Sequence, residues 1–423
     1  MSEIKASVLQ AATAAKAAAG ALAIASTAQK NQALQLIAKA LIDRTDEIVK
    51  VNQLDIAQAE TEKIAPALID RLTLTPDRIA AISAAVLELI ELPDPIGVVL
   101  KTWEMSNGLK FEQRRVPLGV IAMIYEARPN VTVDAAALCL KSGNVALLRG
   151  SSTGDRTNEV LVNVLRDALV AAKLPADCIV KVPGKSHEAV THLIQARGLV
   201  DVVIPRGSAG LIESVVTNSI VPVIETGVGN CHVYLDEQLD VEMAIDIVLN
   251  SKTQRVSVCN AAETLLVHKA AAASVMPKLL AALKAKKVII HGDDLVKKYA
   301  EPAGIEFSDV TEADWHQEYY SLDLAAGIVD SFDDAIAHIK KYSTGHTEAI
   351  VTTNAENAAR FANELDAAAI VINASTRFVD GGEFGFGAEI GISTQKLHAR
   401  GPMGLNELTA IKYVVTGTGQ VRN

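Results

Sequence analysis

The sequence of 423 residues contains few cysteines, few aromatic residues and fewer basic than acidic side chains. Lysine and arginine number 40 against 50 aspartates and glutamates, which gives a formal net charge of −10. A chain with this charge lacks the basic surface that binds nucleic acid backbones or anionic lipids. An aromatic content of 4% also offers little for stacking on bases. We therefore expect neither nucleic acid nor a membrane among its partners.

Cysteine and histidine do not form the patterns that build structural sites. The four cysteines are too scattered for a disulfide framework, and there is no C-x-x-C pair. The nine histidines form no H-E-x-x-H motif or similar cluster, so the sequence predicts no metal site. The dinucleotide fingerprint G-x-G-x-x-G after a strand is also missing.

Long hydrophobic runs are absent as well. No segment reaches the roughly 18 uncharged apolar residues that cross a bilayer. The apolar stretch 17–29 follows Glu3 and Lys16, and apolar residues continue at helical spacing through 32–56. We interpret this region as a pair of amphipathic helices and not as a leader, and we expect the protein in the cytoplasm.

The chain is long enough for two or three domains, and 49% of its residues are hydrophobic. Residues 1–95 are expected to be almost wholly helical, up to the break 91-ELPDPIG-97. Two extended stretches within 98–116 flank Ser106-Asn107-Gly108, a strong hairpin signal. Such a hairpin either adds strands to another subunit's sheet or stays a surface ribbon of one subunit.

From residue 118 on, strand and helix patterns alternate. The first block has expected strands at 118–125, 144–150, 178–184 and 200–208, and expected helices at 132–143, 155–173 and 187–197. The second block has expected strands near 263–267, 287–291, 325–329, 348–352 and 369–373, and the tail 410–422 ends in a strand. Repeated βαβ units predict an α/β fold with parallel sheets in two lobes. Ligands are then expected at the carboxyl ends of strands, after Tyr125, Arg149, Val182 and Ile204.

Cys259 is the candidate nucleophile. It lies in the polar segment 250–264, just before an apolar strand, and Lys252 and Arg255 are close enough in sequence to favour a thiolate. The alternative is a small buried core cysteine. Cys139 and Cys178 fit core positions, and Cys231 is undecided.

Several other residues have weaker signals. Glu225 lies where an apolar strand runs into Glu-Thr-Gly-Val-Gly-Asn, which suits a ligand-facing carboxylate or a simple salt bridge. Gly207-Ser208 opens a helix whose N–H groups can meet a phosphate, and Arg149 ends a strand at the same sheet edge. His398 and Arg400, in the glycine-rich stretch 381–408, are either contacts for an anionic substrate or surface residues.

The order of these segments resembles the aldehyde dehydrogenase superfamily. The run 117–152 looks like its first cofactor-binding unit, 205-PRGSAG-210 like its Gly-Ser turn, and 225-ETGVGN-230 like its glutamate-glycine segment. The Cys259 region follows Glu225 by 34 residues (259 − 225) and matches the nucleophile segment, and 317–336 resembles the cofactor-ribose segment with Glu318. The resemblance implies two Rossmann-like lobes plus a small β oligomerisation element.

The resemblance also implies a domain plan. It places a cofactor-binding domain in 1–95 and 118–225, a catalytic domain with the nucleophile in 226–404, and an oligomerisation hairpin and tail in 96–117 and 405–423. It implies a homo-oligomer in which hairpin and tail pair across subunits. The implied cofactor contacts are Arg149, Gly207, Ser208, Glu225 and Glu318.

One implied role is ambiguous because the usual Pro-Trp-Asn segment is replaced by Tyr-Glu-Ala-Arg-Pro-Asn. By motif, Asn130 is the oxyanion-binding asparagine, but by ungapped spacing Glu126 takes its place. Glu225 is implied to act in proton transfer or cofactor positioning. The lysine usual at the adenosine end is here Arg149, whose guanidinium suits the 2′-phosphate of NADPH.

Six strings are closest to one branch of this superfamily: IYEARPNVT, IETGVGNCHVY, KTQRVSVCNAAETLLVH, HQEYYSLDLA, STRFVDGGEFGFGAEIGIST and HARGPMGL. That branch reduces L-glutamate 5-phosphate with NADPH to L-glutamate 5-semialdehyde and phosphate, through a cysteine thioester, in L-proline biosynthesis. Arg255, His398 and Arg400 are then expected substrate contacts. Functional coupling to glutamate 5-kinase is also implied.

Three other functions remain open at this point. The first is a non-phosphorylating NAD(P)-dependent aldehyde dehydrogenase, in which Glu225 activates water to hydrolyse the thioester. The second is a non-redox cysteine hydrolase that pairs Cys259 with His232 or His268. The third is a catalytically silent protein that keeps the fold.

Overall fold

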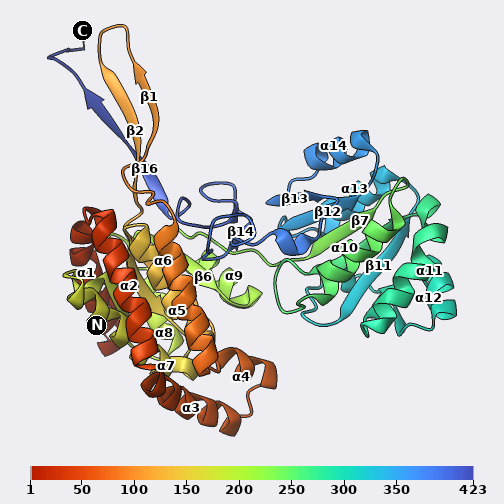
Figure 1. Cartoon of the computed structure of the whole chain (residues 1–423), viewed down its shortest axis with the longest axis horizontal. Coiled ribbons are helices and arrows are strands. Elements are labelled where there is room, and N and C mark those ends of the chain that lie inside the picture. The colour runs from red at the N-terminus through yellow and green to blue at the C-terminus, as the bar shows by residue number, and fades with distance from the viewer. Residues whose placement is uncertain (1, 423) are drawn as a thin grey trace. The chain divides into compact units, whose positions relative to one another are not determined.

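The computed structural model describes residues 2–422, which form two compact units (Figure 1). The first unit contains the chain up to Thr226, Gly385–Gly391 and the chain from Met403 on; the second contains Gly227–Phe384 and Ile392–Pro402. The main boundary lies one residue from the one expected. The glycine-rich stretch is divided, because Gly385–Gly391 clusters with the first unit. The roles assigned to these parts stay predictions.

Five helices make up the N-terminal region, in agreement with the sequence: α1 (Glu3–Ala23), α2 (Thr27–Asp43), α3 (Thr45–Thr61), α4 (Pro66–Leu72) and α5 (Pro76–Glu91). Local chemistry fixes their starts. Ser26 and Gln29 form a reciprocal capping box at α2, and Thr75 caps α5 ahead of Pro76. Their buried faces carry alanine, leucine, isoleucine and valine.

The first unit contains a four-stranded parallel sheet in the order β5-β4-β3-β6. Its strands are β3 (Val120–Tyr125), β4 (Val145–Arg149), β5 (Ile179–Lys181) and β6 (Val202–Arg206); its helices are α6 (Pro129–Lys141), α7 (Asp155–Ala171), α8 (His187–Ile194) and α9 (Ala209–Asn218). Helices α6 and α7 contact the sheet strands, as does α1. Strand order reverses between β3 and β6, which is where such sheets bind ligands.

The predicted strand before Glu225 is reduced to one bridge between Val203 and Val223. The N–H of Val203 donates to the carbonyl of Pro222, and the N–H of Ile224 donates to the carbonyl of Val203. Pro222 has no N–H to extend the ladder, so pairing stops there.

The predicted hairpin is confirmed as β1 (Val99–Glu104) and β2 (Lys110–Pro117), which pair antiparallel. The predicted tail strand is β16 (Thr409–Thr416), and it pairs with β2 of the same chain. Hairpin and tail thus pair with each other within one chain, and the expected pairing of this sheet with another subunit stays a prediction. Figure 1 shows this ribbon extending away from the helices of its unit.

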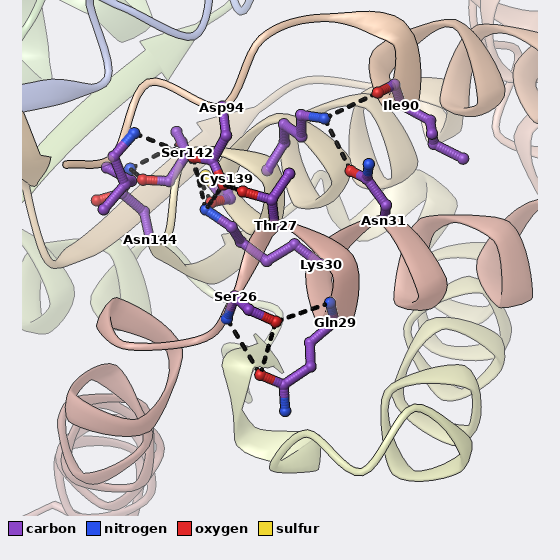
Figure 2. A network of polar contacts seen from close by, with 12 residues as sticks. Ser26, Thr27, Gln29, Lys30, Asn31, Ile90, Asp94, Cys139, Ser142 and Asn144 are labelled. Carbon is purple, nitrogen blue, oxygen red and sulfur yellow. Dashed lines mark hydrogen bonds and ion pairs between the residues drawn. The ribbon is translucent and has the colours of Figure 1, made fainter. Parts of the chain in front are cut away.

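A buried polar network holds the connection between α5 and the hairpin (Figure 2). The Lys30 ammonium donates to Asp94 at 2.8 Å, and Thr27 donates to the same carboxylate at 2.7 Å. The ammonium of Lys141 donates to Asn31 at 2.8 Å and to the carbonyl of Ile90. The break at 91–97 is therefore anchored to α2 and α6 by charge-assisted hydrogen bonds.

The second unit is built on a seven-stranded parallel sheet in the order β10-β9-β11-β8-β7-β12-β13. The strands are β7 (Cys231–Leu235), β8 (Ala262–His268), β9 (Ile289–Gly292), β10 (Phe307–Asp309), β11 (Asp323–Val329), β12 (Thr347–Val351) and β13 (Ala369–Ile372). The helices are α10 (Val241–Thr253), α11 (Lys269–Ala285), α12 (Asp294–Ala303), α13 (Phe332–Tyr342) and α14 (Ala355–Glu364). Strands β7 and β10 were not predicted.

Only two short strands interrupt the glycine-rich stretch, β14 (Ile392–Ser393) and β15 (Gly401–Pro402), which pair antiparallel. Single 3₁₀ turns lie at Ser152–Gly154, Ala176–Cys178, Asp314–His316 and Thr376–Phe378. Within residues 2–422 no helix combines the length and apolarity needed to traverse a bilayer.

Candidate active site

Cys259 lies in the loop between the end of α10 and the start of β8. Because every strand of this sheet runs in the same direction, the loop belongs to the edge formed by the amino ends of the strands. The side chain is half-buried, whereas Cys139, Cys178 and Cys231 are buried. Partial exposure distinguishes Cys259 as the accessible thiol among the four.

The backbone of the nucleophile loop packs directly on the glycine-rich segment before β7. A Cβ on Gly229 would lie 1.6 Å from the carbonyl oxygen of Cys259 and 2.8 Å from its Cα. The thiol of Cys231 donates to that same carbonyl at 3.2 Å. Only glycine fits at residue 229, so the Gly-Val-Gly signal seen in the sequence marks a close backbone approach.

Lys252 does not act as a free positive charge that stabilises the Cys259 thiolate, although its position in the sequence suggested this. Its ammonium is fully buried and donates to Glu263 at 2.5 Å, so its charge is neutralised by a carboxylate on β8. Burial raises the pKa of Glu263 to about 7, although Lys252 acts in the opposite direction. Arg255 is exposed on the same loop as Cys259. Of the two cations that the sequence pointed to, Arg255 is therefore the one without a buried carboxylate partner in an ion pair.

A segment that sequence reasoning left without a role, 375–380, is bound to this loop. The Thr376 hydroxyl donates to the carbonyl of Asn260 at 2.6 Å, and the Asn260 amide donates to the carbonyl of Val379 at 2.9 Å. Cys259 packs against the small apolar cluster that contains Val379. Arg377 of this segment interacts electrostatically with Cys259 and Arg255. The string STRFVDGG was noticed in the sequence, but only the chain reversal after β13 brings it here.

Glu318 also lies at the amino-end edge, ahead of β11. It is buried, and its Oε2 accepts a hydrogen bond from the Tyr320 hydroxyl at 2.5 Å. Its Oε1 forms no hydrogen bond of full geometry among residues 2–422, although the backbone N–H of Gly229 is directed at this carboxylate. Burial raises the pKa of Glu318, while Tyr320 and the backbone N–H of Gly229 act in the opposite direction. A buried carboxylate with a vacant acceptor suits a hydroxyl-bearing ligand.

The two expected anion contacts in the glycine-rich stretch have other surroundings. Arg400 donates to Asp366 at 2.6 Å through Nη1 and to its backbone carbonyl through Nη2. Lys396 pairs with the same carboxylate. His398 is exposed. Arg400 and Lys396 thus share one carboxylate, so Nη1 and Nη2 of Arg400 already have acceptors in Asp366 while the group keeps a net positive charge.

In the first unit, the carboxyl ends of β3 and β6 meet at the strand-order reversal. The Glu126 N–H donates to the carbonyl of Arg206 at 3.1 Å, and the Ser208 hydroxyl donates to the Glu126 carboxylate at 2.7 Å. A Cβ on Gly207 would lie 2.7 Å from the Glu126 carboxyl carbon. Ser208 is the N-cap of α9 and makes no side-chain cap, and its hydroxyl instead holds the Glu126 carboxylate beside the start of this helix.

The remaining predicted residues of this unit are Asn130, Arg149 and Glu225. The Asn130 amide, in the first turn of α6, donates to Asp134 at 3.0 Å. Burial raises the pKa of Asp134 to about 6. Arg149 ends β4 and donates to backbone carbonyls of Gly150 and Ser186, and its buried Nε has no acceptor among the described residues. Glu225 is half-buried.

The histidines proposed for a cysteine hydrolase have structural partners. His232 is fully buried on β7, and its Nδ1 lies 2.9 Å from the Glu348 carboxylate. His268 accepts a hydrogen bond from the N–H of Ala270 and caps α11. Within the described residues, no group of three or more His, Cys, Asp and Glu side chains is arranged to hold a metal ion.

Comparisons with known proteins agree with this architecture. Residues 2–298 match the model of the aldehyde dehydrogenase family. A curated relative from Thermobifida fusca (strain YX), "Gamma-glutamyl phosphate reductase", is 58% identical over 422 residues. The match spans 100% of this chain and 100% of the relative. The crystal structure of γ-glutamyl phosphate reductase from Thermotoga maritima superposes with a TM-score of 0.94 at 44% identity, covering 98% of this chain and 100% of that one.

A second solved structure, γ-glutamyl phosphate reductase from Saccharomyces cerevisiae, has a TM-score of 0.55 at 31% identity and covers 100% of this chain and 99% of that one. An acetylating aldehyde dehydrogenase from Geobacillus thermoglucosidasius, at 18% identity and a TM-score of 0.69, shares the fold. The half-buried thiol, the glycine packed on its backbone and these similarities lead to one conclusion: the chain belongs to the aldehyde dehydrogenase family, in the branch of the γ-glutamyl phosphate reductases.

Proposed function

We propose that this chain reduces L-glutamate 5-phosphate to L-glutamate 5-semialdehyde and phosphate with NADPH, as a step of L-proline biosynthesis. The name of the relative that is 58% identical over the full length supports this activity. The observation that carries the chemistry is the half-buried Cys259, whose loop is fixed by Gly229 and lies near Arg255 and Arg377.

In the proposed reaction, the Cys259 thiolate attacks the acyl carbon of the acyl phosphate. The carbon–oxygen bond to phosphate breaks, phosphate leaves, and a thioester forms on Cys259. We assign Arg255, which is exposed on the same loop, to the phosphate. The oxyanion that forms during attack needs hydrogen-bond donors, and one such donor typically contributes about 3–4 kcal/mol. The backbone N–H of Cys259 and the amide of Asn130 remain the candidate donors.

NADPH, when bound, supplies the hydride that converts the thioester to the aldehyde. The chain offers groups that fit such a dinucleotide. We assign Gly207 and Ser208, at the start of α9, to a phosphate of the cofactor, and Arg149, whose Nε has no acceptor among the described residues, to the 2′-phosphate. The vacant Oε1 of Glu318 suits a ribose hydroxyl. These features support NADPH as the cofactor that we propose.

Glu225 has a different role in this reaction than in a hydrolytic aldehyde dehydrogenase. The phosphate-releasing direction consumes no water, so a strong base for hydrolysis is not required. We assign Glu225 to proton transfer or cofactor positioning. Activity independent of phosphate would instead favour the non-phosphorylating alternative.

We further propose a cytoplasmic homo-oligomer that receives its substrate from a kinase such as glutamate 5-kinase. Four free thiols fit a reducing compartment. An acyl phosphate is a reactive anhydride, which favours functional coupling to the kinase that forms it. Val99, Leu100, Ile411, Tyr413 and Val415 are exposed on the hairpin-and-tail sheet. Such an apolar surface supports contact with a second copy of the chain.

The test is an assay of the reverse reaction with L-glutamate 5-semialdehyde, NADP or NAD, and with or without inorganic phosphate. We expect oxidation that requires phosphate and prefers NADP. Cys259→Ser should abolish it, because a serine hydroxyl is a far weaker nucleophile than a thiolate at neutral pH. Near-normal turnover in Cys259→Ser, with thermal unfolding unchanged, would refute the thioester mechanism.

A further inference from the structure

A cavity close to the nucleophile loop combines an arginine with two carboxylates. Its volume is about 250 Å³, and it lies entirely within the second unit. Its lining residues are Asn250, Gln254, Arg377, Phe378, Asp380 and Glu383. A cavity that offers both charge signs suits a zwitterion better than a simple anion.

Arg377 is the cation among the residues that line this cavity. Its Nε donates to the Gln254 side chain at 2.8 Å, whereas its Nη1 is buried and has no acceptor among residues 2–422. Arg377 lines the cavity with a planar guanidinium, which is the side chain best suited to pair with an incoming carboxylate. Burial lowers the pKa of Arg377, with Arg255 adding to the effect and Asp380 opposing it. Arginine nevertheless stays charged at any physiological pH.

The two carboxylates of the cavity, Asp380 and Glu383, are not neutralised by an ion pair with Arg377. No ion pair within the described part of the chain joins Arg377 to Asp380 or Glu383. Asp380 Oδ1 accepts a hydrogen bond from the backbone N–H of Gly382 at 2.9 Å, which positions the carboxylate. Two carboxylates near each other can hold a cation between them, and an ammonium group offers three donors.

Hydrogen bonds connect the segment that lines the cavity to the loop that carries the nucleophile. Thr376, next to Arg377, donates to Asn260, and Asn260 donates to Val379, next to Asp380. Gln254 is the C-cap of α10, whose following loop carries Cys259. A ligand held in the cavity is therefore held by the same segments that fix the thiol.

We propose that this cavity binds the α-amino-acid head group of the substrate, with the α-carboxylate on Arg377 and the α-ammonium on Asp380 and Glu383. The proposal rests on the function proposed above. In L-glutamate 5-phosphate, two methylene groups separate the α carbon from the acyl carbon, so a head group bound here directs the acyl carbon towards the loop of Cys259. The assignment replaces Arg400, whose Nη1 and Nη2 both already donate to Asp366.

The test compares three aldehydes: L-glutamate 5-semialdehyde, 4-aminobutanal, which lacks the carboxylate, and 5-oxopentanoate, which lacks the ammonium. Arg377→Gln should lower kcat/KM roughly 10- to 100-fold for the two carboxylate-bearing aldehydes, the range expected for a lost charge-assisted hydrogen bond. Any loss of positive charge near Cys259 should lower kcat/KM by a common factor for all three aldehydes, so 4-aminobutanal should fall by that factor alone. The double variant Asp380→Asn/Glu383→Gln should instead penalise the two ammonium-bearing aldehydes and spare 5-oxopentanoate.

Arg360→Gln is the matched control, because Arg360 is a cation on α14 that pairs with Asp333 and Glu364 in the same unit. Arg377→Lys is the second variant, to be used if Arg377→Gln does not fold. It keeps the positive charge but loses the planar guanidinium, and it should retain part of the preference for carboxylate-bearing aldehydes. Equal loss with all three aldehydes in the Arg377 variants would overturn the head-group assignment while leaving the proposed function intact. A wild-type enzyme that fails to oxidise the semialdehyde would refute both.

Discussion

Replacing Gly229 with alanine tests whether the close approach of two backbones fixes the nucleophile. The added Cβ would lie 1.6 Å from the carbonyl oxygen, 2.5 Å from the carbonyl carbon and 2.8 Å from the Cα of Cys259. All three atoms are backbone, so no side-chain rotation relieves the overlap. A carbon–oxygen contact normally needs about 3.3 Å, so one segment must move by more than an ångström.

The expected cost follows from this displacement. Overpacking of a well-packed site typically costs about 1–3 kcal/mol of stability. A shift of about 1 Å in a catalytic group typically costs about 100-fold in rate. We therefore expect Gly229→Ala to lower kcat/KM for semialdehyde oxidation by about two orders of magnitude and to lower the thermal unfolding midpoint. The rate at which an alkylating reagent modifies Cys259 should change as well.

Gly20→Ala is the control, because no atom lies within 4 Å of a Cβ at this exposed position inside α1. It should leave activity unchanged and add about 0.5–1 kcal/mol through helix propensity. If Gly229→Ala matched the wild type in unfolding midpoint, thiol reactivity and kcat/KM, the close approach would not constrain the nucleophile and the reasoning would be wrong.

Two further predictions concern buried charges. Lys252→Met leaves Glu263 buried without its partner and should lower the free energy of unfolding in urea by about 3–5 kcal/mol. The double variant Lys252→Met/Glu263→Leu should recover most of that stability. If Lys252→Met were as stable as the wild type, the buried ion pair would not contribute as we infer. Asp134→Asn should stabilise the protein by about 1–3 kcal/mol above pH 6 and have little effect below pH 4. The sign follows because burial raises the Asp134 pKa to about 6 in the folded state, so its contribution to stability is present at low pH and is lost as pH rises. A difference in unfolding free energy independent of pH would contradict it.

Much of the fold could be predicted because it depends on neighbours in the chain. Apolar spacing predicted the helices of residues 1–95, and Asn107-Gly108 predicted the hairpin of β1 and β2. Buried strands such as β3, β4 and β8 were read from continuous apolar runs. Two short strands were not predicted. Strand β7 follows directly on a glycine-rich segment, and β10 has only three residues. Periodicity needs a longer window than either provides.

The site could be predicted only in part. The sequence singled out Cys259 by its polar setting, and the structure makes it the accessible thiol. Lys252 was misread, because its partner Glu263 is 11 residues away along the chain but 2.5 Å away in space. Arg377 had no assigned role, since nothing local shows that the chain reverses after β13 and returns to Asn260.

The sequence by itself therefore determined the α/β class, most of the helices and strands, and the identity of the candidate nucleophile. These properties arise from hydrophobic periodicity, turn chemistry and local polarity, which act over a few residues. Only the tertiary structure decided the strand order, the pairing of β16 with β2, the packing of Gly229 on Cys259 and the cavity around Arg377. Each of these joins segments distant in sequence, and burial, ion pairing and backbone contact there depend on distances that folding alone sets.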